Sequence, residues 1–207
     1  MSLEQEIKLQ VTQADSLNLQ ALGWLTSMLK QDVYQQHLLS TYFDTPDKAL
    51  MTFGVGLRLR QIGEQWLQTV KCSGRASSGL HERQEWEHEL VAPVFDLERL
   101  AETAIAPLLE QEQVWSAIEP VFTTEFERDV WLLVLEADTV VELAYDRGEV
   151  RAGGKQTAIH EIELELKHGD IEHCQKLADK LKAALPLEYS NISKAGLGYK
   201  LSQGTDK

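Results

Sequence analysis

The sequence contains little cysteine and no long apolar segment. Its 207 residues include only Cys72 and Cys174, and neither belongs to a CxxC pair or lies near histidine at zinc-ligand spacing. A disulfide framework is therefore excluded, and a structural zinc site does not fit. No apolar run approaches the ~20 residues that span a bilayer. Residues 1–6 are polar and lack the apolar segment of a secretory signal peptide. These absences predict a cytoplasmic chain with no membrane partner.

Basic residues are also scarce. Lysine and arginine together number 20, against 33 aspartates and glutamates, so the formal net charge is −13. Proteins that bind nucleic acid non-specifically neutralise phosphates with an excess of basic side chains, so we expect no nucleic-acid partner. No segment rich in proline, glycine or serine divides the chain, and 43% of the residues are hydrophobic, which is ample for a core. The sequence predicts a single domain over residues 1–207.

Alternation of apolar and polar residues dominates the chain. A period of two places alternate side chains on one face of a β-strand. The pattern predicts nine strands, roughly the number that closes a β-barrel. They span residues 4–11, 37–43, 54–62, 64–72, 80–91, 121–128, 130–137, 140–150 and 157–168.

Three segments have helical spacing instead. Residues 15–29 carry an apolar stripe that includes Leu17, Leu22 and Leu25. Residues 96–112 form a second segment, which Pro107 is expected to kink or split. Residues 170–185 form the third, closed by Pro186. Together these patterns predict a predominantly β (α+β) fold, an antiparallel sheet with a few helices packed outside.

Charged residues on the predicted strands are sorted by sign. Carboxylates form two period-two ladders, Glu85-x-Glu87-x-Glu89 and Glu161-x-Glu163-x-Glu165. The first strand presents Glu4, Glu6 and Lys8 on one face, and the basic residues Arg58, Arg60 and Lys71 lie on two further strands.

Either ladder alone is most simply the solvated face of a sheet. The ladders taken together with the basic residues do not fit that explanation as well, because acidic rows and basic rows lie on separate strands with apolar residues on the opposite faces. A barrel whose apolar outer faces are covered by helices must turn its charged faces inward. Like charges two residues apart repel and require a compensating cation. Carboxylates suit a divalent metal ion, while arginine and lysine suit phosphate.

The sequence resembles the CYTH superfamily, the triphosphate tunnel metalloenzymes. Its first motif is ExExK, present here as EQEIK at residues 4–8. The resemblance extends over about residues 3–202 through the segments YFDTP (42–46), LRLR (57–60), TVK (69–71), ERQEWE (82–87), FER (126–128), YDRG (145–148), EIELELK (161–167) and SKAG (193–196). The segment PVFTTEFER (120–128) and Ser193-Lys194 are most similar to the bacterial inorganic triphosphatases, in which a helical CHAD domain often follows.

That resemblance implies an eight-stranded antiparallel β-barrel tunnel that holds a triphosphate and Mg²⁺ or Mn²⁺. By motif position, it assigns phosphate contacts to Lys8, Arg58, Arg60, Lys71, Arg128 and Lys194. Arg83 either joins these residues or pairs with a neighbouring carboxylate. The metal ligands it implies are Glu4, Glu6, Asp146, Glu163 and Glu165. The catalytic set is Glu4, Glu6, Lys8, Glu85 and Glu87.

The expected activity is hydrolysis of inorganic tripolyphosphate to diphosphate and phosphate by direct attack of water. Basic side chains would cancel the substrate's charge before the nucleophile approaches. Three alternatives stay open: a thiamine triphosphatase, a class IV adenylyl cyclase on the same fold, and a non-catalytic module that binds polyphosphate or nucleotide. The histidines lack a shared ligand spacing, and we interpret most of them as surface residues.

Overall fold

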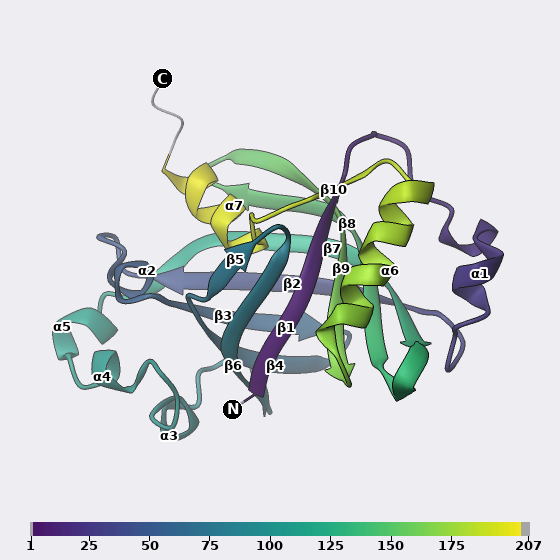
Figure 1. The fold of residues 1–207 in the computed structure, drawn as a ribbon. Coiled ribbons are helices and arrows are strands. Elements are labelled where there is room, and N and C mark those ends of the chain that lie inside the picture. The colour runs from purple at the N-terminus through teal and green to yellow at the C-terminus, as the bar shows by residue number, and fades with distance from the viewer. Residues whose placement is uncertain (1, 204–207) are drawn as a thin grey trace.

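A closed antiparallel β-barrel forms the centre of the computed structural model, which describes residues 2–203 (Figure 1). Eight strands surround the lumen in the order β1-β9-β8-β7-β2-β3-β4-β6, and β6 pairs with β1 to close the barrel. The predicted eight-stranded barrel is therefore confirmed. The barrel strands are β1 (Ser2–Val11), β2 (Tyr34–Asp44), β3 (Val55–Ile62), β4 (Gln65–Cys72), β6 (Leu80–Leu90), β7 (Glu119–Val134), β8 (Val140–Ala152) and β9 (Lys155–His168).

Shorter elements surround the barrel. Strand β5 (Arg75–Ser77) extends β6, and β10 (Leu187–Tyr189) extends the sheet beside β1. Within residues 2–203, no helix combines the length and apolar character needed to cross a membrane. The helices are η1 (Leu19–Ala21), α1 (Gly23–Thr26), α2 (Ala49–Phe53), α3 (Leu97–Leu100), α4 (Ala106–Leu109), α5 (Glu112–Trp115), η2 (Glu136–Asp138), α6 (Ile171–Ala184) and α7 (Lys194–Ser202).

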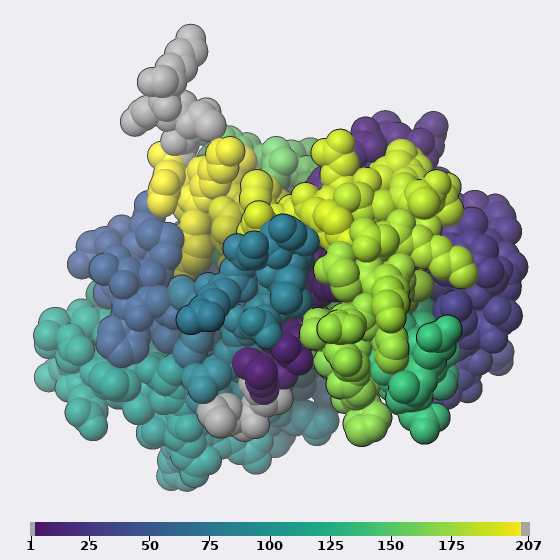
Figure 2. Space-filling view, in the orientation of Figure 1, coloured from purple at the N-terminus to yellow at the C-terminus, as the bar shows by residue number. Residues whose placement is uncertain are grey.

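Helix α6 covers the outer face of β1 and β9. Its N-cap is Asp170, whose side chain accepts a hydrogen bond from the Glu172 backbone N–H, as expected for a helix that starts there. The apolar stripe of α6 packs against outward residues such as Ile7 and Leu164. In the space-filling view only small parts of β1 reach the surface between β6 and α6 (Figure 2). Because Ile7, Leu9 and Val11 are buried in the cluster under this helix, the even-numbered residues Glu4, Glu6 and Lys8 must face the lumen.

A second apolar cluster covers the outer faces of β3 and β4. Leu57 and Val70 contact residues of α2 and of the segment that contains α3, α4 and α5. That segment was predicted as one helix over residues 96–112, kinked or split at Pro107. The structure splits it into three one-turn helices, and Pro107 lies in the first turn of α4, where proline is tolerated.

The lumen itself contains a third apolar cluster. Phe122 and Phe126 project inward from β7 and pack with Val150, Ile159 and Tyr199. Tyr199 belongs to α7, which lies across one end of the barrel (Figure 1). One end of the lumen is therefore apolar and covered by α7, and the charged residues occupy the rest.

The predicted helix over residues 15–29 is wrong. The structure has η1 and the one-turn helix α1 there, although Leu17 and Leu25 of the predicted stripe are buried. Local bonds compete with a continuous helix: Asn18 Oδ1 accepts from the Ala21 N–H at 3.2 Å, and the Leu17 N–H donates to the Tyr145 hydroxyl at 2.9 Å. Side-chain capping and a tertiary bond therefore replace the helical hydrogen bonds.

The prediction of two separate strands at residues 121–128 and 130–137 is also wrong. They form one strand, β7, because its residues on both sides of Asp129 stay paired without a break to β8. Strands β5 and β10 and helices α2 and α7 were not predicted.

Close contact between α7 and the barrel depends on Gly198. A Cβ atom at this position would lie 2.1–2.2 Å from the Phe122 ring. We expect Gly198→Ala to lower the free energy of unfolding by about 1–3 kcal/mol through overpacking. Gly196→Ala on the same helix is the control, because its nearest neighbour would be at an ordinary 3.5 Å. Equal stability of the two variants in urea denaturation would contradict this packing.

Candidate active site

The charged part of the lumen is a cavity of about 830 Å³ lined by residues of the barrel strands and of α7. All but one of the site residues expected from the sequence line it: Glu4, Glu6, Lys8, Arg58, Arg60, Lys71, Arg83, Glu85, Glu87, Arg128, Glu163, Glu165 and Lys194. The exception is Asp146, which is fully buried behind Arg128 and Lys194. The acidic and basic rows therefore converge on one interior space.

One wall of the cavity is acidic. Glu6 on β1 and Glu142 on β8 are each paired directly with Glu165 on the intervening strand β9. Burial, followed by the nearby carboxylates Glu142 and Glu4, raises the pKa of Glu165, although Lys167 opposes the shift at 2.8 Å. This wall carries more negative charge than its basic neighbours neutralise.

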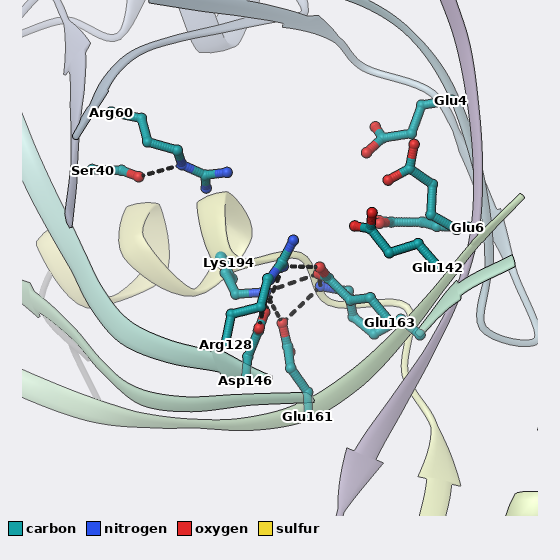
Figure 3. Close-up of polar contacts among 12 residues, drawn as sticks. Glu4, Glu6, Ser40, Arg60, Arg128, Glu142, Asp146, Glu161, Glu163 and Lys194 are labelled. Carbon is teal, nitrogen blue, oxygen red and sulfur yellow. Dashed lines mark hydrogen bonds and ion pairs between the residues drawn. The ribbon is translucent and has the colours of Figure 1, made fainter. Parts of the chain in front are cut away.

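The facing wall is basic. Arg60 on β3 lies across the lumen from Glu4, Glu6 and Glu142 (Figure 3). Its Nε donates to Ser40 Oγ at 2.9 Å, and no carboxylate of the described residues lies within 4 Å of its guanidinium. Burial and the neighbouring cations Arg58 and Arg128 lower the pKa of Arg60 to about 10. A shift in that direction marks a buried cation that lacks a counter-ion.

Arg58 on the same wall is only loosely paired. Its Nη2 lies 3.8 Å from Glu85 and 3.7 Å from Glu87, beyond hydrogen-bond distance, and its buried Nε has no partner. Arg58 Nη1 donates to the Tyr42 hydroxyl at 3.3 Å. Burial would raise the pKa of Tyr42, but Arg58 and Arg60 lower it to about 8. The basic wall therefore offers free donors to an anion.

Two cations, Lys71 and Arg83, form ion pairs with Glu4 on the acidic wall. Arg83 Nε contacts Glu4 at 2.6 Å and its Nη2 contacts Glu6 at 2.9 Å, while Lys71 contacts Glu4 at 2.8 Å. Although burial favours the neutral acid, Lys71 and Arg83 lower the pKa of Glu4 to about 2. Of the two roles expected for Arg83, the structure shows the carboxylate pairing.

A compact ion network lies beside the acidic wall. Arg128 and Lys194 contact the carboxylates of Asp146, Glu161 and Glu163 (Figure 3). Lys8 adds ion pairs to Glu161 and Glu163. The carboxylate oxygens of this group come within 4.8 Å of one another, close enough for a metal ion. Three cations already balance three carboxylates, however, so this network has no charge deficit that a metal ion would satisfy.

The network also fixes the protonation of its members. Burial opposes ionisation, but Lys194, Lys8 and Arg128 hold the pKa of Glu163 well below its usual range, and Arg128 and Lys194 lower the pKa of Asp146. The stabilisation is complete above the pKa of an unfolded carboxyl and is lost as the pH falls through these lowered values. Ser193 caps α7 and thereby places Lys194, its first residue, inside the lumen.

Sequence reasoning missed several residues of the cavity. Glu142 has the same parity on β8 as Asp146, and that signal should have identified it as facing the lumen. His81 lies on β6 opposite Glu6, is buried and lines the cavity, so it is an exception to the interpretation of most histidines as surface residues. Its Nε2 is 3.0 Å from the Ser190 carbonyl oxygen, which requires a proton on Nε2.

The sequence model of the CYTH domain matches residues 2–199. The chain belongs to the CYTH domain family. This CYTH chain is 31% identical over 198 residues to the inorganic triphosphatase of Haemophilus influenzae, with 95% of the chain and 55% of that protein covered. The chain therefore spans about half the length of the relative that it matches.

Solved structures confirm the fold. A putative adenylyl cyclase from Hippeastrum, described as having a dominant triphosphatase activity, matches with a TM-score of 0.61 and 20% identity over 95% of each chain. A protein from Pyrococcus horikoshii matches with a TM-score of 0.53 and 16% identity, over 95% of this chain and 99% of that one. At these identities the likeness establishes the CYTH architecture alone.

Asp146 tests the buried network. Replacing it with asparagine leaves Arg128 and Lys194 with too little negative charge in a buried setting, so we expect Asp146→Asn to lower the free energy of unfolding by about 3 kcal/mol. The control is Glu125→Gln, which disrupts the exposed pair with Arg151 and should cost less than about 1 kcal/mol. If urea denaturation finds similar losses in both variants, the network does not stabilise the barrel.

Proposed function

We propose that this chain hydrolyses inorganic tripolyphosphate to diphosphate and phosphate with the help of Mg²⁺ or Mn²⁺. The observation that carries the proposal is the opposition of an acidic wall and a basic wall, each incompletely neutralised, inside one cavity. A triphosphate with bound metal ions supplies both missing charges together. The 31% identity to the Haemophilus influenzae inorganic triphosphatase supports the same activity.

The basic wall would bind the phosphate chain. Arg58 and Arg60 have guanidinium donors that no carboxylate occupies at hydrogen-bond distance, and guanidinium groups match phosphate oxygens in a bidentate manner. Lys71 would add a third cation, because its ion pairs with Glu4 and Glu85 leave it on the cavity surface. Arg128, Lys8 and Lys194 would contact the chain from the buried network.

The acidic wall fits a divalent cation. Its donors are carboxylate oxygens, which Mg²⁺ and Mn²⁺ prefer. We assign the cation to Glu6, Glu142 and Glu165, with Glu4 beside them, and we assign Asp146 and Glu163 to holding Arg128 and Lys194 in place. When bound, the cation would screen the charge that develops on the phosphate oxygens.

The chain's own residues would act mainly by position and charge. Phosphoryl transfer involves little covalent chemistry for the protein, so catalysis depends on orienting the terminal phosphate and stabilising its oxygens. Arg58 and Arg60 would fix the chain against the basic wall. Glu85 and Glu87, which lie 3.7–3.8 Å from Arg58, would keep that guanidinium turned toward the lumen.

The lining of the cavity favours an inorganic substrate over a nucleotide. Among the described lining residues, the only phenol, phenyl or indole rings are those of Tyr42 and Tyr199. Tyr42 stacks on Phe122 at 4.5 Å between ring centroids, and Tyr199 donates to Asp44 at 2.8 Å. Both are buried, so a nucleobase would find no exposed ring of these types to stack on.

Substrate comparison tests the proposal directly. The purified protein is incubated with tripolyphosphate, ATP or thiamine triphosphate in Mg²⁺, and in parallel with EDTA. We expect the highest kcat/KM for tripolyphosphate, with phosphate release lost in EDTA. Cyclic AMP as the main product from ATP, or a preference for thiamine triphosphate, would contradict the proposed substrate. Tight binding of tripolyphosphate without metal-dependent hydrolysis would identify a binding module instead.

Glu142 tests the assignment of the acidic wall. We expect Glu142→Gln to raise the Mg²⁺ concentration needed for half-maximal activity by about 10- to 100-fold, because it removes one charged ligand. The control is Glu149→Gln on the same strand, whose side chain pairs with Arg151 outside the cavity. The KM for tripolyphosphate at saturating Mg²⁺ should change little in either variant. An unaltered Mg²⁺ requirement in Glu142→Gln would exclude this ligand.

A further inference from the structure

We propose that Phe126 is a positioning residue whose ring holds phosphate-binding cations in place without neutralising them. Three cations lie over the ring, with distances to its centroid of 4.9 Å for Lys194 Nζ, 5.6 Å for Arg128 Cζ and 5.9 Å for Arg60 Cζ. Each is within the ~6 Å over which a ring face attracts a cation. The proposal rests on the proposed function, because it concerns how the same site is prepared for an anion.

The Phe126 ring is buried in the lumen, where β7 pairs with β8. Phe126 is only 2% exposed and projects into the lumen from β7, two residues before Arg128. Its direct partner on β8 is Gly148, where a Cβ atom would lie 2.5 Å from the Cα and Cβ atoms of Phe126. The nearest atom would be the Glu125 carbonyl oxygen at 2.1 Å, so the absence of a side chain at Gly148 lets β8 approach the backbone of β7 closely at Phe126. The Phe126 ring packs with the apolar cluster on one side and lies beside the cations of the charged cavity on the other.

Arg60 depends on this ring more than the other two cations do. Arg128 and Lys194 have carboxylate partners in the buried network, whereas the described contacts of the Arg60 guanidinium are Ser40 Oγ and the Phe126 ring. The low pKa of Arg60 agrees with this scarcity of negative charge. Ser40 and Phe126 thus hold a long, flexible side chain whose charge stays uncompensated.

A ring suits this task better than a carboxylate. A carboxylate beside Arg60 would form an ion pair that the substrate must break, and phosphate oxygens would have to compete with it. The negative face of an aromatic ring attracts a cation but accepts no bidentate hydrogen bond, so the donors stay available. Restricting the side chain beforehand reduces the conformational entropy lost when the anion binds.

Packing alone also explains a buried phenylalanine, and the chain provides a matched control for that explanation. Phe122 lies four residues earlier on β7, belongs to the same cluster and is 3% exposed. Its ring contacts are with Tyr42 and Tyr199, at 4.5 and 5.1 Å between centroids, rather than with cations. A purely structural role predicts similar effects at the two positions.

Fluorination separates charge attraction from packing, because fluorine atoms weaken the negative ring face while changing its shape little. We would replace Phe126 with mono-, di- and trifluorophenylalanine and measure the dissociation constant of tripolyphosphate calorimetrically in EDTA. We expect it to rise stepwise with fluorine number, reaching about 3- to 30-fold for the trifluoro ring. The same series at Phe122 should stay within about twofold.

A second measurement requires no substrate. In the ligand-free protein, the heteronuclear NOE of the Arg60 Nε–Hε group reports whether the guanidinium is held. We expect a lower value in Phe126→Leu than in the wild type, and an unchanged value in Phe122→Leu.

The outcomes separate the two proposals. If the wild type binds tripolyphosphate and fluorination has no effect at Phe126, or the same effect at Phe122, the role of the ring is overturned. If the wild type neither binds nor hydrolyses tripolyphosphate, the proposed function fails, and the Arg60 mobility alone decides whether the ring positions that cation. Unchanged Arg60 mobility in Phe126→Leu would overturn the proposal independently of any ligand.

Discussion

The burial of both signs of charge inside a closed barrel is the constraint on which the rest of this structure depends. Helices cover the outer faces of β1, β9, β3 and β4, so alternate residues of those strands must face the lumen. Ionised side chains in such a place lose hydration and need partners of opposite charge. In one part of the lumen every charge has a partner of opposite sign, and in another part the charges are only partly neutralised. The two parts have different consequences.

Where the balance is complete, the charges stabilise the barrel. Lys8, Arg128 and Lys194 match Asp146, Glu161 and Glu163, and through Lys194 the network ties α7 to the strands. Where the balance is incomplete, the charges are available to a ligand. Glu6, Glu142 and Glu165 repel one another on one wall, while Arg60 lacks a carboxylate on the other. A site prepared for a charged ligand commonly sacrifices stability in this way.

Sequence patterns predicted the barrel and the rows of charged residues that face the lumen. They could do so because alternate residues of a strand point to opposite faces, which is a local property of the chain. Once Ile7 and Leu9 are assigned to the covered face of β1, Glu6 and Lys8 must point the other way. Parity does not reveal which inward residues meet, because that depends on the register between strands distant in sequence. Glu163 and Glu165 are therefore equivalent in the sequence, although one balances Lys194 and the other faces Glu142.

Other elements could not be predicted from the sequence because contacts with distant residues determine their conformation. Of the apolar stripe predicted over residues 15–29, Leu17 and Leu25 are buried, but the bond from Leu17 to Tyr145 is formed with a strand more than a hundred residues away. The helix α7 has no strong periodic pattern, and its position depends on the cap at Ser193 and on the bond from Tyr199 to Asp44. Such tertiary contacts override local preference and leave little trace in composition.

The central claim is that the divalent cation binds the incompletely balanced acidic wall, and not the carboxylates of the balanced network, while the phosphate chain lies against the basic wall. Anomalous diffraction from crystals containing Mn²⁺ and tripolyphosphate tests it most directly. The account predicts manganese among the carboxylates of Glu6, Glu142 and Glu165, with phosphate oxygens against Arg58 and Arg60. Manganese between Asp146, Glu161 and Glu163, or a phosphate chain bound outside the barrel, would contradict it.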